Sequence, residues 1–326
     1  MTFNALLPTL ITADAQLISS SATESADTTW VAWTAGSQTF TLGDTYKYAH
    51  VRYEVLQTYT RTSVATDHVP GAVGSEDWWL ALEATEQWAM FDNQSSTVTE
   101  DVGVLVVEVK PGAVFNSGSV VGVVGATSVL WETFSGAGRT VGDLVWSEEK
   151  LLDASYIADW YAYWFNPYDV YSDLLFGGID GTTGNGAMPP YLSGEVRLTV
   201  TGYTIGTTVG VAGFLVGTSV PLGEVLNGAS GGIIDFSVNE TDAYGVRTLV
   251  VRGFAKQNSV SFKVEKSQFR RVASTLAQLR AIPAVWVPSG DVDLSPMVTF
   301  GPVQEWSYDV AYRDHIIFSL EVNGLT

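Results

Sequence analysis

The chain has 326 residues, of which 46% are hydrophobic and 16% charged, a composition that excludes wholesale disorder and allows two or three domains. The formal net charge of −19 is concentrated in residues 1–190, which hold 6 Lys/Arg against 23 Asp/Glu, so binding to nucleic acid or to an anionic membrane is disfavoured. The chain contains no cysteine, which excludes disulfides, thiolate metal sites and cysteine nucleophiles.

Residues 1–29 are predicted to form an N-terminal arm and a polar linker, with the arm packed on the body or on a neighbouring subunit. The first eight residues lack a basic region and Pro8 interrupts their apolar run, so we expect no signal peptide. We also expect no membrane span, because no stretch reaches the roughly 18 continuous apolar residues that a spanning helix needs.

Residues 30–91 are predicted to form a compact aromatic β module, since Val51, Tyr53 and Val55 recur at the spacing that places side chains on one face of a strand. Trp78 and Trp79 are adjacent, so within a strand they face opposite sides and at most one enters a given core layer. Three interpretations of these aromatic side chains stay open: core packing, an interface with another domain or subunit, and stacking against sugar rings. The candidate sugar-binding residues are Trp30, Trp33, Tyr53, Trp78 and Trp79.

Residues 92–215 are predicted to form a β-sandwich, because short apolar runs such as 102–109 and 196–204 alternate with frequent turn signals. An aromatic segment at 159–168 interrupts this pattern and is predicted to serve core packing or a subunit interface. Its candidate interface residues are Trp160, Tyr161, Trp164 and Phe165.

Residues 216–326 are predicted to form an α+β unit in which one helix covers a sheet. A hairpin turn is expected at residues 242–245. The helix is expected from Ser267 to Ala281, with Ser267 as its N-cap and Pro283 beyond its end. Its apolar positions recur at intervals of three and four residues: Phe269, Val272, Leu276 and Leu279. The fold class predicted for the whole chain is therefore mainly β, with a sandwich, a small aromatic insert and a C-terminal α+β domain.

No catalytic pattern emerges from the residues. The three histidines, His50, His68 and His315, are far apart and match no metal-binding motif. The acid pairs Glu76/Asp77 and Asp153/Asp159 lie near tryptophans, but 35 acids produce such neighbours by chance, and adjacent strand residues face opposite sides. We therefore expect no enzyme, no cofactor and no metal, and a polysaccharide depolymerase is the weakest alternative.

Three segments together resemble virion structural proteins of long-tailed bacteriophages, and the resemblance covers nearly the whole chain in order. The segments are Trp88-Ala89-Met90-Phe91-Asp92, Asp159-Trp160-Tyr161-Ala162-Tyr163-Trp164-Phe165-Asn166-Pro167, and the C-terminal run from Thr241-Asp242-Ala243-Tyr244-Gly245 to Val322-Asn323-Gly324-Leu325-Thr326. The resemblance implies a tail-tip or baseplate component that is assembled in the host cytoplasm, forms a homo-oligomer around the tail axis and binds other tail proteins.

Many members of that family carry an N-terminal insert similar to a chitin-binding type of carbohydrate-binding module. Here the insert runs from Trp30 through Phe40-Thr41-Leu42-Gly43-Asp44 and Val51-Arg52-Tyr53-Glu54-Val55 to Trp78-Trp79, with Phe40 where the pattern usually has tyrosine. The resemblance thus implies contact with host-surface glycans. A free, lectin-like carbohydrate-binding protein is the alternative function that residues 30–91 suggest.

Overall fold

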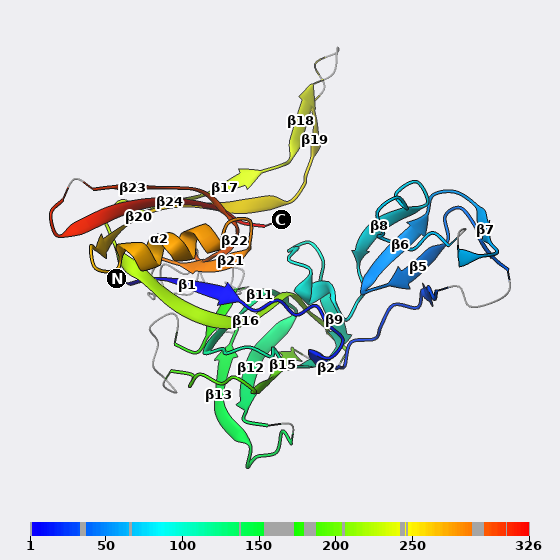
Figure 1. Ribbon diagram of the computed structural model, residues 1–326, viewed down its shortest axis with the longest axis horizontal. Coiled ribbons are helices and arrows are strands. Elements are labelled where there is room, and N and C mark those ends of the chain that lie inside the picture. Colours follow the sequence, from blue (N-terminus) through cyan, green and yellow to red (C-terminus); the bar gives the residue numbers. More distant parts are fainter. Residues whose placement is uncertain are drawn as a thin grey trace, which may run out of the picture.

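The protein is mainly β, with one α-helix near the C-terminus among the described residues, as the sequence predicted. The computed structural model describes residues 2–32, 37–64, 67–136, 138–152, 173–178, 187–203, 206–241, 245, 247–288, 297–310 and 312–325. Figure 1 shows a central body, a smaller lobe (blue and cyan) beside it, and a hairpin (yellow) that projects from the body.

A large antiparallel sheet runs through the whole body (Figure 1). Its main path is β22 (Thr299–Gly301), β21 (Ala284–Val287), β1 (Thr2–Pro8), β16 (Thr208–Val225), β20 (Phe254–Glu265), β24 (His315–Asn323) and β23 (Val303–Asp309). Four further strands attach to this path: β9 (Thr99–Val102) and β11 (Ser117–Val124) on β16, β14 (Leu174–Phe176) on β11, and β17 (Ser230–Asp235) on β20.

Strand β16 is 18 residues long and joins the two halves of the body. Its first half pairs with β9 on one edge and β11 on the other, and its second half pairs with β1 and β20 in the same way. At Gly217 the two sets meet, since this residue pairs with both Pro8 and Ser117. The predicted boundary between residues 215 and 216 therefore falls inside one continuous strand.

The predicted N-terminal arm contributes strands to both sheets of the body. Strand β1 lies between β16 and β21, and its Phe3, Ala5 and Leu6 are buried. Strand β2 (Leu17–Ser20) forms an edge of the second sheet. In the sequence alone β1 resembles an unpaired arm, because its ladder partners in β16 lie more than 200 residues away.

The second sheet completes a β-sandwich with the first half of β16. Its order is β13 (Leu144–Leu151), β12 (Ala126–Phe134), β15 (Glu195–Gly202), β10 (Val104–Val109) and β2. Alternate residues of β15 are buried, as a half-buried strand requires: Val196, Leu198 and Val200. Trp131 lies fully buried at the centre, between Phe176 and Phe214, with ring centroids 5.2 Å from each.

Helix α2 (Phe269–Gln278) covers the C-terminal part of the large sheet, and its Val272 and Leu276 are buried against Phe262 and Phe318. The predicted N-cap is wrong, because Gln268 occupies that position and Ser267 instead donates its hydroxyl to Glu265, at 3.4 Å. The helix ends at Gln278, and Ala281 beyond it adopts a left-handed conformation with φ 62°. No helix of the described ranges has the length and apolar character that crossing a bilayer requires.

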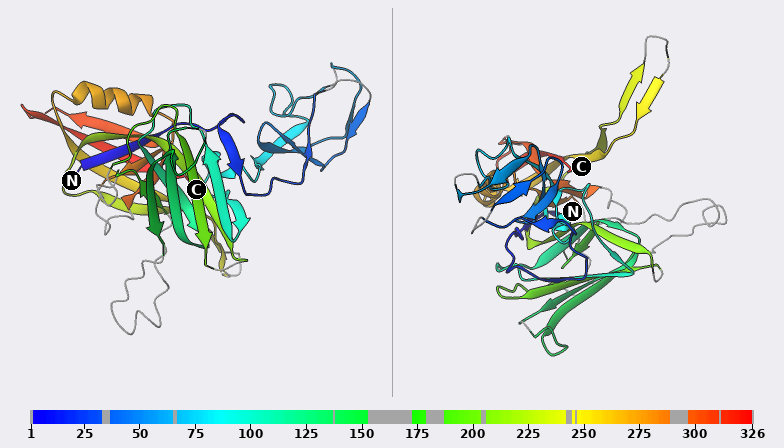
Figure 2. Two further views of the ribbon diagram at one scale, coloured as in Figure 1. Left: turned by 90° about the horizontal axis from the view of Figure 1, so that it is seen from below. Right: turned by 90° about the vertical axis from the view of Figure 1, so that its right-hand side faces the viewer.

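The smaller lobe, which we term the aromatic module, has its own sheet and its own core. The sheet is β3 (Thr28–Thr29), β5 (Thr45–Tyr48), β6 (Val51–Val55) and β8 (Trp79–Ala84), with β4 (Gln38–Phe40) paired to β7 (Tyr59–Arg61). A 3-10 turn, η2 (Ala89–Phe91), follows the module and buries Met90 in the sandwich core. Figure 2 shows the module standing beside the body in a second view.

A two-stranded hairpin, β18 (Val238–Thr241) and β19 (Arg247–Val250), extends away from the body in Figures 1 and 2. These strands pair only with each other among the described strands. We use the name hairpin arm for β18 and β19 together with the flanking Phe236, Val251 and Arg252.

Candidate functional site

Three of the five candidate sugar-binding residues are buried in the core of the aromatic module. Trp30, Tyr53 and Trp79 belong to this core, and Trp79 is only 4% exposed. At its centre Phe40 contacts Tyr59 with ring centroids 4.8 Å apart and Trp79 with centroids 5.4 Å apart. Trp79 also donates its indole N–H to the carbonyl of His68, at 2.7 Å. These rings are occupied by their neighbours, so their faces are not free to stack on a ligand.

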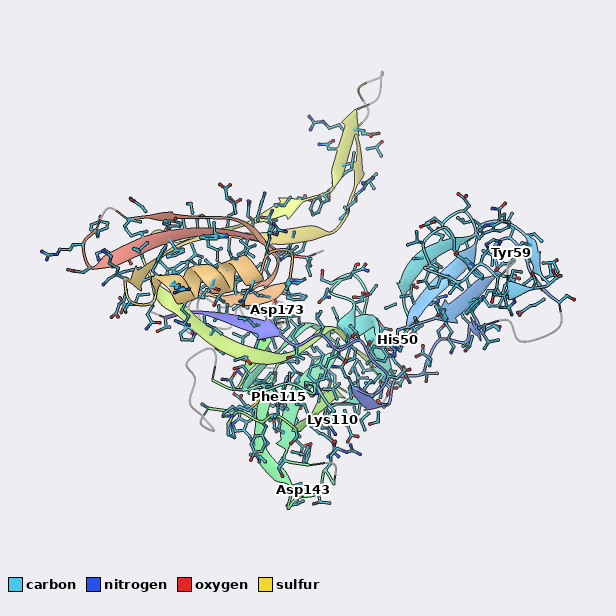
Figure 3. All side chains as sticks on the ribbon, in the orientation of Figure 1. His50, Tyr59, Lys110, Phe115, Asp143 and Asp173 are labelled. Atoms are coloured by element: carbon cyan, nitrogen blue, oxygen red, sulfur yellow. The ribbon has the colours of Figure 1, made fainter. Side chains whose placement is uncertain are left out.

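Trp78 is the predicted residue that reaches the surface of the module. It lies in the turn before β8, is half-buried where Trp79 is buried, and packs against the same aromatic core. Its ring stacks on His68 with centroids 4.2 Å apart and an interplanar angle of 10°, and the edge of Tyr59 lies 5.0 Å away. Figure 3 marks Tyr59 in the module. The Trp78–His68 stack is therefore the aromatic surface that the module offers to a ligand.

The other candidate residues lie outside the described ranges. Trp33 falls in the undescribed residues 33–36, and the predicted interface residues Trp160, Tyr161, Trp164 and Phe165 fall in residues 153–172.

A buried arginine, which the sequence analysis did not single out, organises the module core. Arg61 is 3% exposed and donates to the Val31 carbonyl at 2.7 Å, to Asp67 at 2.9 Å and to Gln38 at 2.6 Å. Its guanidinium also lies 5.3 Å from the centroid of the Phe40 ring, close enough for a cation–π interaction. The charge thus joins β4, the segments around Val31 and Asp67, and the aromatic core.

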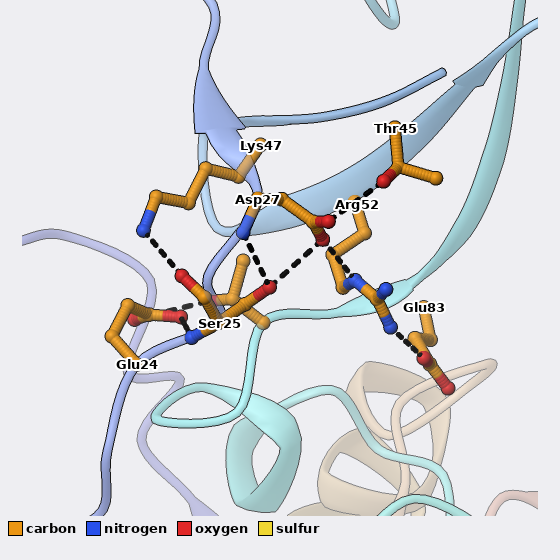
Figure 4. A network of polar contacts seen from close by, with 8 residues as sticks. Glu24, Ser25, Asp27, Thr45, Lys47, Arg52 and Glu83 are labelled. Atoms are coloured by element: carbon orange, nitrogen blue, oxygen red, sulfur yellow. Dashed lines mark hydrogen bonds and ion pairs between the residues drawn. The ribbon is translucent and has the colours of Figure 1, made fainter.

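The module is attached to the body by a linker whose acidic residue is held by several donors (Figure 4). Asp27 accepts hydrogen bonds from Thr45 at 2.7 Å, Arg52 at 2.5 Å and Ser25 at 2.8 Å. Burial raises the pKa of Asp27. The hydrogen bonds from Thr45, Arg52 and Ser25 lower it by a larger amount, so the pKa falls from 3.8 to about 2. The carboxylate is therefore charged at neutral pH, and it fastens the linker to β5 and β6.

Further polar contacts hold the module beside the same linker. Lys47 donates to the Ser25 carbonyl at 2.8 Å, and Gln87 donates to the Ala22 carbonyl at 2.8 Å. His50 stacks on Trp88 with ring centroids 3.7 Å apart, and its Nε2 lies 3.4 Å from a carboxylate oxygen of Asp14 in the body (Figure 3).

The turn that presents His50 is an unusual two-residue hairpin loop. Ala49 and His50 join β5 to β6, and both have positive φ, at 48° and 69°. Residues with a Cβ rarely adopt positive φ, because this backbone conformation is strained. The contacts around the turn offset the free-energy cost of the strain. A cleft of about 540 Å³ opens beside the turn, lined by Asp14, Glu24, Lys47, Tyr48 and His50 among others.

Of the acids considered for glycoside hydrolysis, the structure describes only Glu76 and Asp77. Glu76 and Asp77 are exposed in the loop before β8, where Glu76 accepts the backbone N–H of Gly74 at 2.8 Å. Asp153 and Asp159 lie outside the described residues. Within the part of the chain that the structure describes, no three His, Asp or Glu side chains are grouped as a metal site would require.

A second candidate surface is the hairpin arm, where large apolar side chains face solvent. Leu249 is 65% exposed and Val251 is 78% exposed, and Phe236 and Val250 are also exposed. Three consecutive apolar residues, 249–251, cover both faces of the strand, which is an unfavourable arrangement in water unless a partner covers it. The hairpin arm therefore has the character of a protein-contact surface.

Neither a family model nor a curated protein matches this sequence.

Proposed function

We propose that this protein is a structural component of the tail tip or baseplate of a long-tailed bacteriophage, where it assembles with other tail proteins. The observation that carries the proposal is the hairpin arm, a projecting strand pair with apolar side chains on both faces. Exposed apolar surface of this kind is typical of protein contacts. The resemblance of three sequence segments to virion structural proteins supports the same function.

The arrangement of the body fits a protein that transmits contacts rather than one that turns over a substrate. Strand β16 joins the sandwich to the C-terminal unit in one sheet, and the module and the hairpin arm extend from the body as separate appendages. A protein that exposes one surface on the aromatic module and another on the hairpin arm can bind two different neighbours at once. In this proposal the body sits in the virion and the appendages contact its neighbours.

The proposal is tested by locating the chain in virus particles. Mass spectrometry of purified virions is expected to detect it, and immunogold labelling with an antibody against the folded protein is expected to place gold at the distal end of the tail. Purified virions without the chain would refute the proposal.

A second candidate function is carbohydrate binding by the aromatic module, as a free lectin-like protein or as the host contact of the virion. The observation that favours it is the half-exposed Trp78 stacked on His68, since rigid surface aromatics bind the C–H faces of sugar rings.

Two tryptophan variants test the second candidate. Trp78→Ala is expected to abolish retention on chitin or peptidoglycan fragments while the module stays folded. Trp79→Ala, at the buried neighbour, is instead expected to destabilise the module, because truncating a buried tryptophan costs about 3–5 kcal/mol. Undetectable binding of the wild-type protein across a broad glycan array would remove this candidate.

A further inference from the structure

The sheet of the C-terminal unit has one face that is exposed and polar. Helix α2 packs on the other face, where Phe262 and Phe318 are buried, and Figure 2 shows the helix on one side of the strands. Side chains alternate along a strand, so every second residue of β20, β24 and β23 points away from α2. We term this surface the open face. It consists of Ser259, Ser261 and Lys263 of β20, Ile317, Ser319 and Glu321 of β24, and Glu305, Ser307 and Asp309 of β23.

The open face carries two acidic side chains that repel each other. Glu305 lies directly opposite Glu321 in the ladder between β23 and β24, and like charges in this position destabilise a sheet. Gln257 donates to Glu321 at 2.6 Å, but neither glutamate forms an ion pair among the described residues. The cation of the open face, Lys263, lies 3.8 Å from Glu224 of β16. A cation supplied by another molecule would therefore stabilise the glutamate pair.

The exposed side of α2 is cationic. Residues 266–284 hold four Lys/Arg and no acid, although the whole chain has 16 Lys/Arg and 35 Asp/Glu. Arg270 and Arg280 are exposed near the two ends of the helix, and neither forms an ion pair within the part of the chain that the structure describes. The small side chains of Ser274 and Ala277 are exposed between them. The C-terminal unit thus has a cationic helix on one side and an acidic sheet face on the other.

The charges on these two surfaces have a similar spacing. Arg270 and Arg280 are ten positions apart, which is about 15 Å at the rise of an α-helix. Glu305 and Asp309 are four positions apart, which is about 13 Å at the rise of a strand. Both acids are exposed. Two arginines of one molecule can therefore each meet an acid of another at the same time.

We infer that α2 of one copy docks on the open face of a second copy of this chain. Arg270 and Arg280 of the docked helix then contact Glu305, Glu321 and Asp309, and the serines of the open face leave room for the helix to approach. A sheet covered by helices on both faces is a common layered arrangement. This inference rests on the proposed function in that it names the contact through which the structural component associates with itself.

The contact is head-to-tail, because α2 and the open face lie on opposite sides of the same sheet. One copy can therefore not use both surfaces on the same neighbour. Such heterologous contacts close into a ring when the rotation between copies permits and otherwise form an open filament.

Sedimentation of the purified full-length chain at low salt tests the inference. The wild-type protein is expected to form species larger than the 35.1 kDa monomer, and salt at about 0.5 M is expected to weaken them because the contact is ionic. Glu305→Lys and Arg270→Glu are each expected to raise the dissociation constant by at least about tenfold, since each brings like charges together in the contact.

Two control variants make the same changes of net charge outside the contact. Glu100→Lys and Lys110→Glu alter exposed side chains of the sandwich and are expected to leave the association unchanged. Glu100→Lys and Glu305→Lys both reduce the negative charge of the chain. A loss of association in Glu305→Lys alone therefore reports the contact rather than the net charge.

A mixing experiment shows whether the two surfaces meet each other. Glu305→Lys and Arg270→Glu are each expected to be monomeric alone, and an equimolar mixture is expected to assemble again. In the mixture, Arg270 of one variant meets Glu305 of the other, and the introduced glutamate meets the introduced lysine. If the mixture stays monomeric while circular dichroism shows both variants folded, the two surfaces do not form the contact and the inference fails.

The outcomes for the inference and for the proposed function are separable. A wild-type chain that stays monomeric at tens of micromolar in low salt overturns the inference, as it would if a basic segment of another protein covered the open face. Its detection in virions would still uphold the proposed function. An assembly that Glu305→Lys dissociates, from a chain absent in virions, would uphold the inference and refute the function.

Discussion

Arg61 shows how one buried charge can replace apolar packing in a small core. The side chain lies among Trp30, Phe40 and Asp67, where an unpaired cation would be very costly. The carboxylate of Asp67, the carbonyl of Val31 and the side chain of Gln38 accept hydrogen bonds from its two terminal nitrogens, whereas its Nε is buried without a partner among the described residues.

We predict that Arg61→Ala destabilises the aromatic module by about 3–5 kcal/mol, because it leaves these polar groups without their donor. Denaturant unfolding followed by tryptophan fluorescence measures the loss. The double variant Arg61→Ala with Asp67→Ala is expected to recover part of it, since no buried carboxylate then remains. A change below about 0.5 kcal/mol for the single variant would contradict a structural role for this charge.

Asp27 gives the attachment of the module a dependence on pH. Its pKa in the folded protein, about 2, lies below the ordinary value of 3.8, so its contribution to stability is fully present above about pH 4 and is lost as the pH falls towards 2. The contribution is on the order of 1–2 kcal/mol, allowing for solvent screening. We expect the difference in thermal stability between wild type and Asp27→Asn to be clear at neutral pH and to shrink between pH 4 and pH 2. A difference in thermal stability that stays constant between pH 4 and pH 2 would contradict a lowered pKa of Asp27.

At the scale of single residues, the sequence did not predict how Trp78 and Trp79 are placed. Trp79 begins β8, but Trp78 lies in the turn before it and packs against the same core, so the alternation of strand side chains does not apply to this pair. The burial of Arg61 could not be predicted, because its partners Val31, Gln38 and Asp67 are brought together only by the fold, and an arginine alone in sequence is typical of a surface.

Among the elements, β11 and β12 of the sandwich meet at a contact that leaves no room for a side chain. A Cβ on Gly118 would lie 2.0 Å from the indole ring of Trp131, which is fully buried and held by Phe176 and Phe214. Glycine at this position therefore allows the two sheets to approach each other around the largest core side chain.

We predict that Gly118→Ala destabilises the body by about 1–3 kcal/mol or more, since the overpacked ring has no space into which it can move. Calorimetric or denaturant unfolding measures the effect. The matched control is Gly136→Ala, at a position with nothing within 4 Å of the added Cβ, and it is expected to be within about 0.5 kcal/mol of wild type. Equal effects of both substitutions would show that Trp131 can relocate.

The elements themselves were predictable where their pattern is local. Phe269, Val272, Leu276 and Leu279 predicted α2 because helical periodicity needs no distant partner. The course of β16 was not predictable, because its residues on either side of position 215 differ in their partners rather than in their own pattern. Strand β1 likewise depends on a ladder with residues more than 200 positions away.

At the scale of the whole molecule, the core of the aromatic module is separate from the three hydrophobic clusters of the body. The aromatic module has its own cluster, from Trp30 to Trp79, whereas the body is continuous through β16. The module connects to the body through two chain segments and the polar contacts around Asp27 and His50.

We predict two calorimetric unfolding transitions, one for the module and one for the body, because separate cores unfold as separate cooperative units. Trp79→Ala is expected to lower the module transition alone, and Gly118→Ala the body transition alone. A single transition shifted by both substitutions would show that the module and the body unfold together.

The length of β16 determines how the body responds to mechanical force. A pull along this strand loads its hydrogen bonds to β1, β9, β11 and β20 in shear, since ladder bonds lie perpendicular to the strands, and whole rows must then rupture together. No turn or hinge interrupts the strand between the sandwich and the C-terminal unit. Tension applied at one end of the body is therefore transmitted to the other end along one continuous strand.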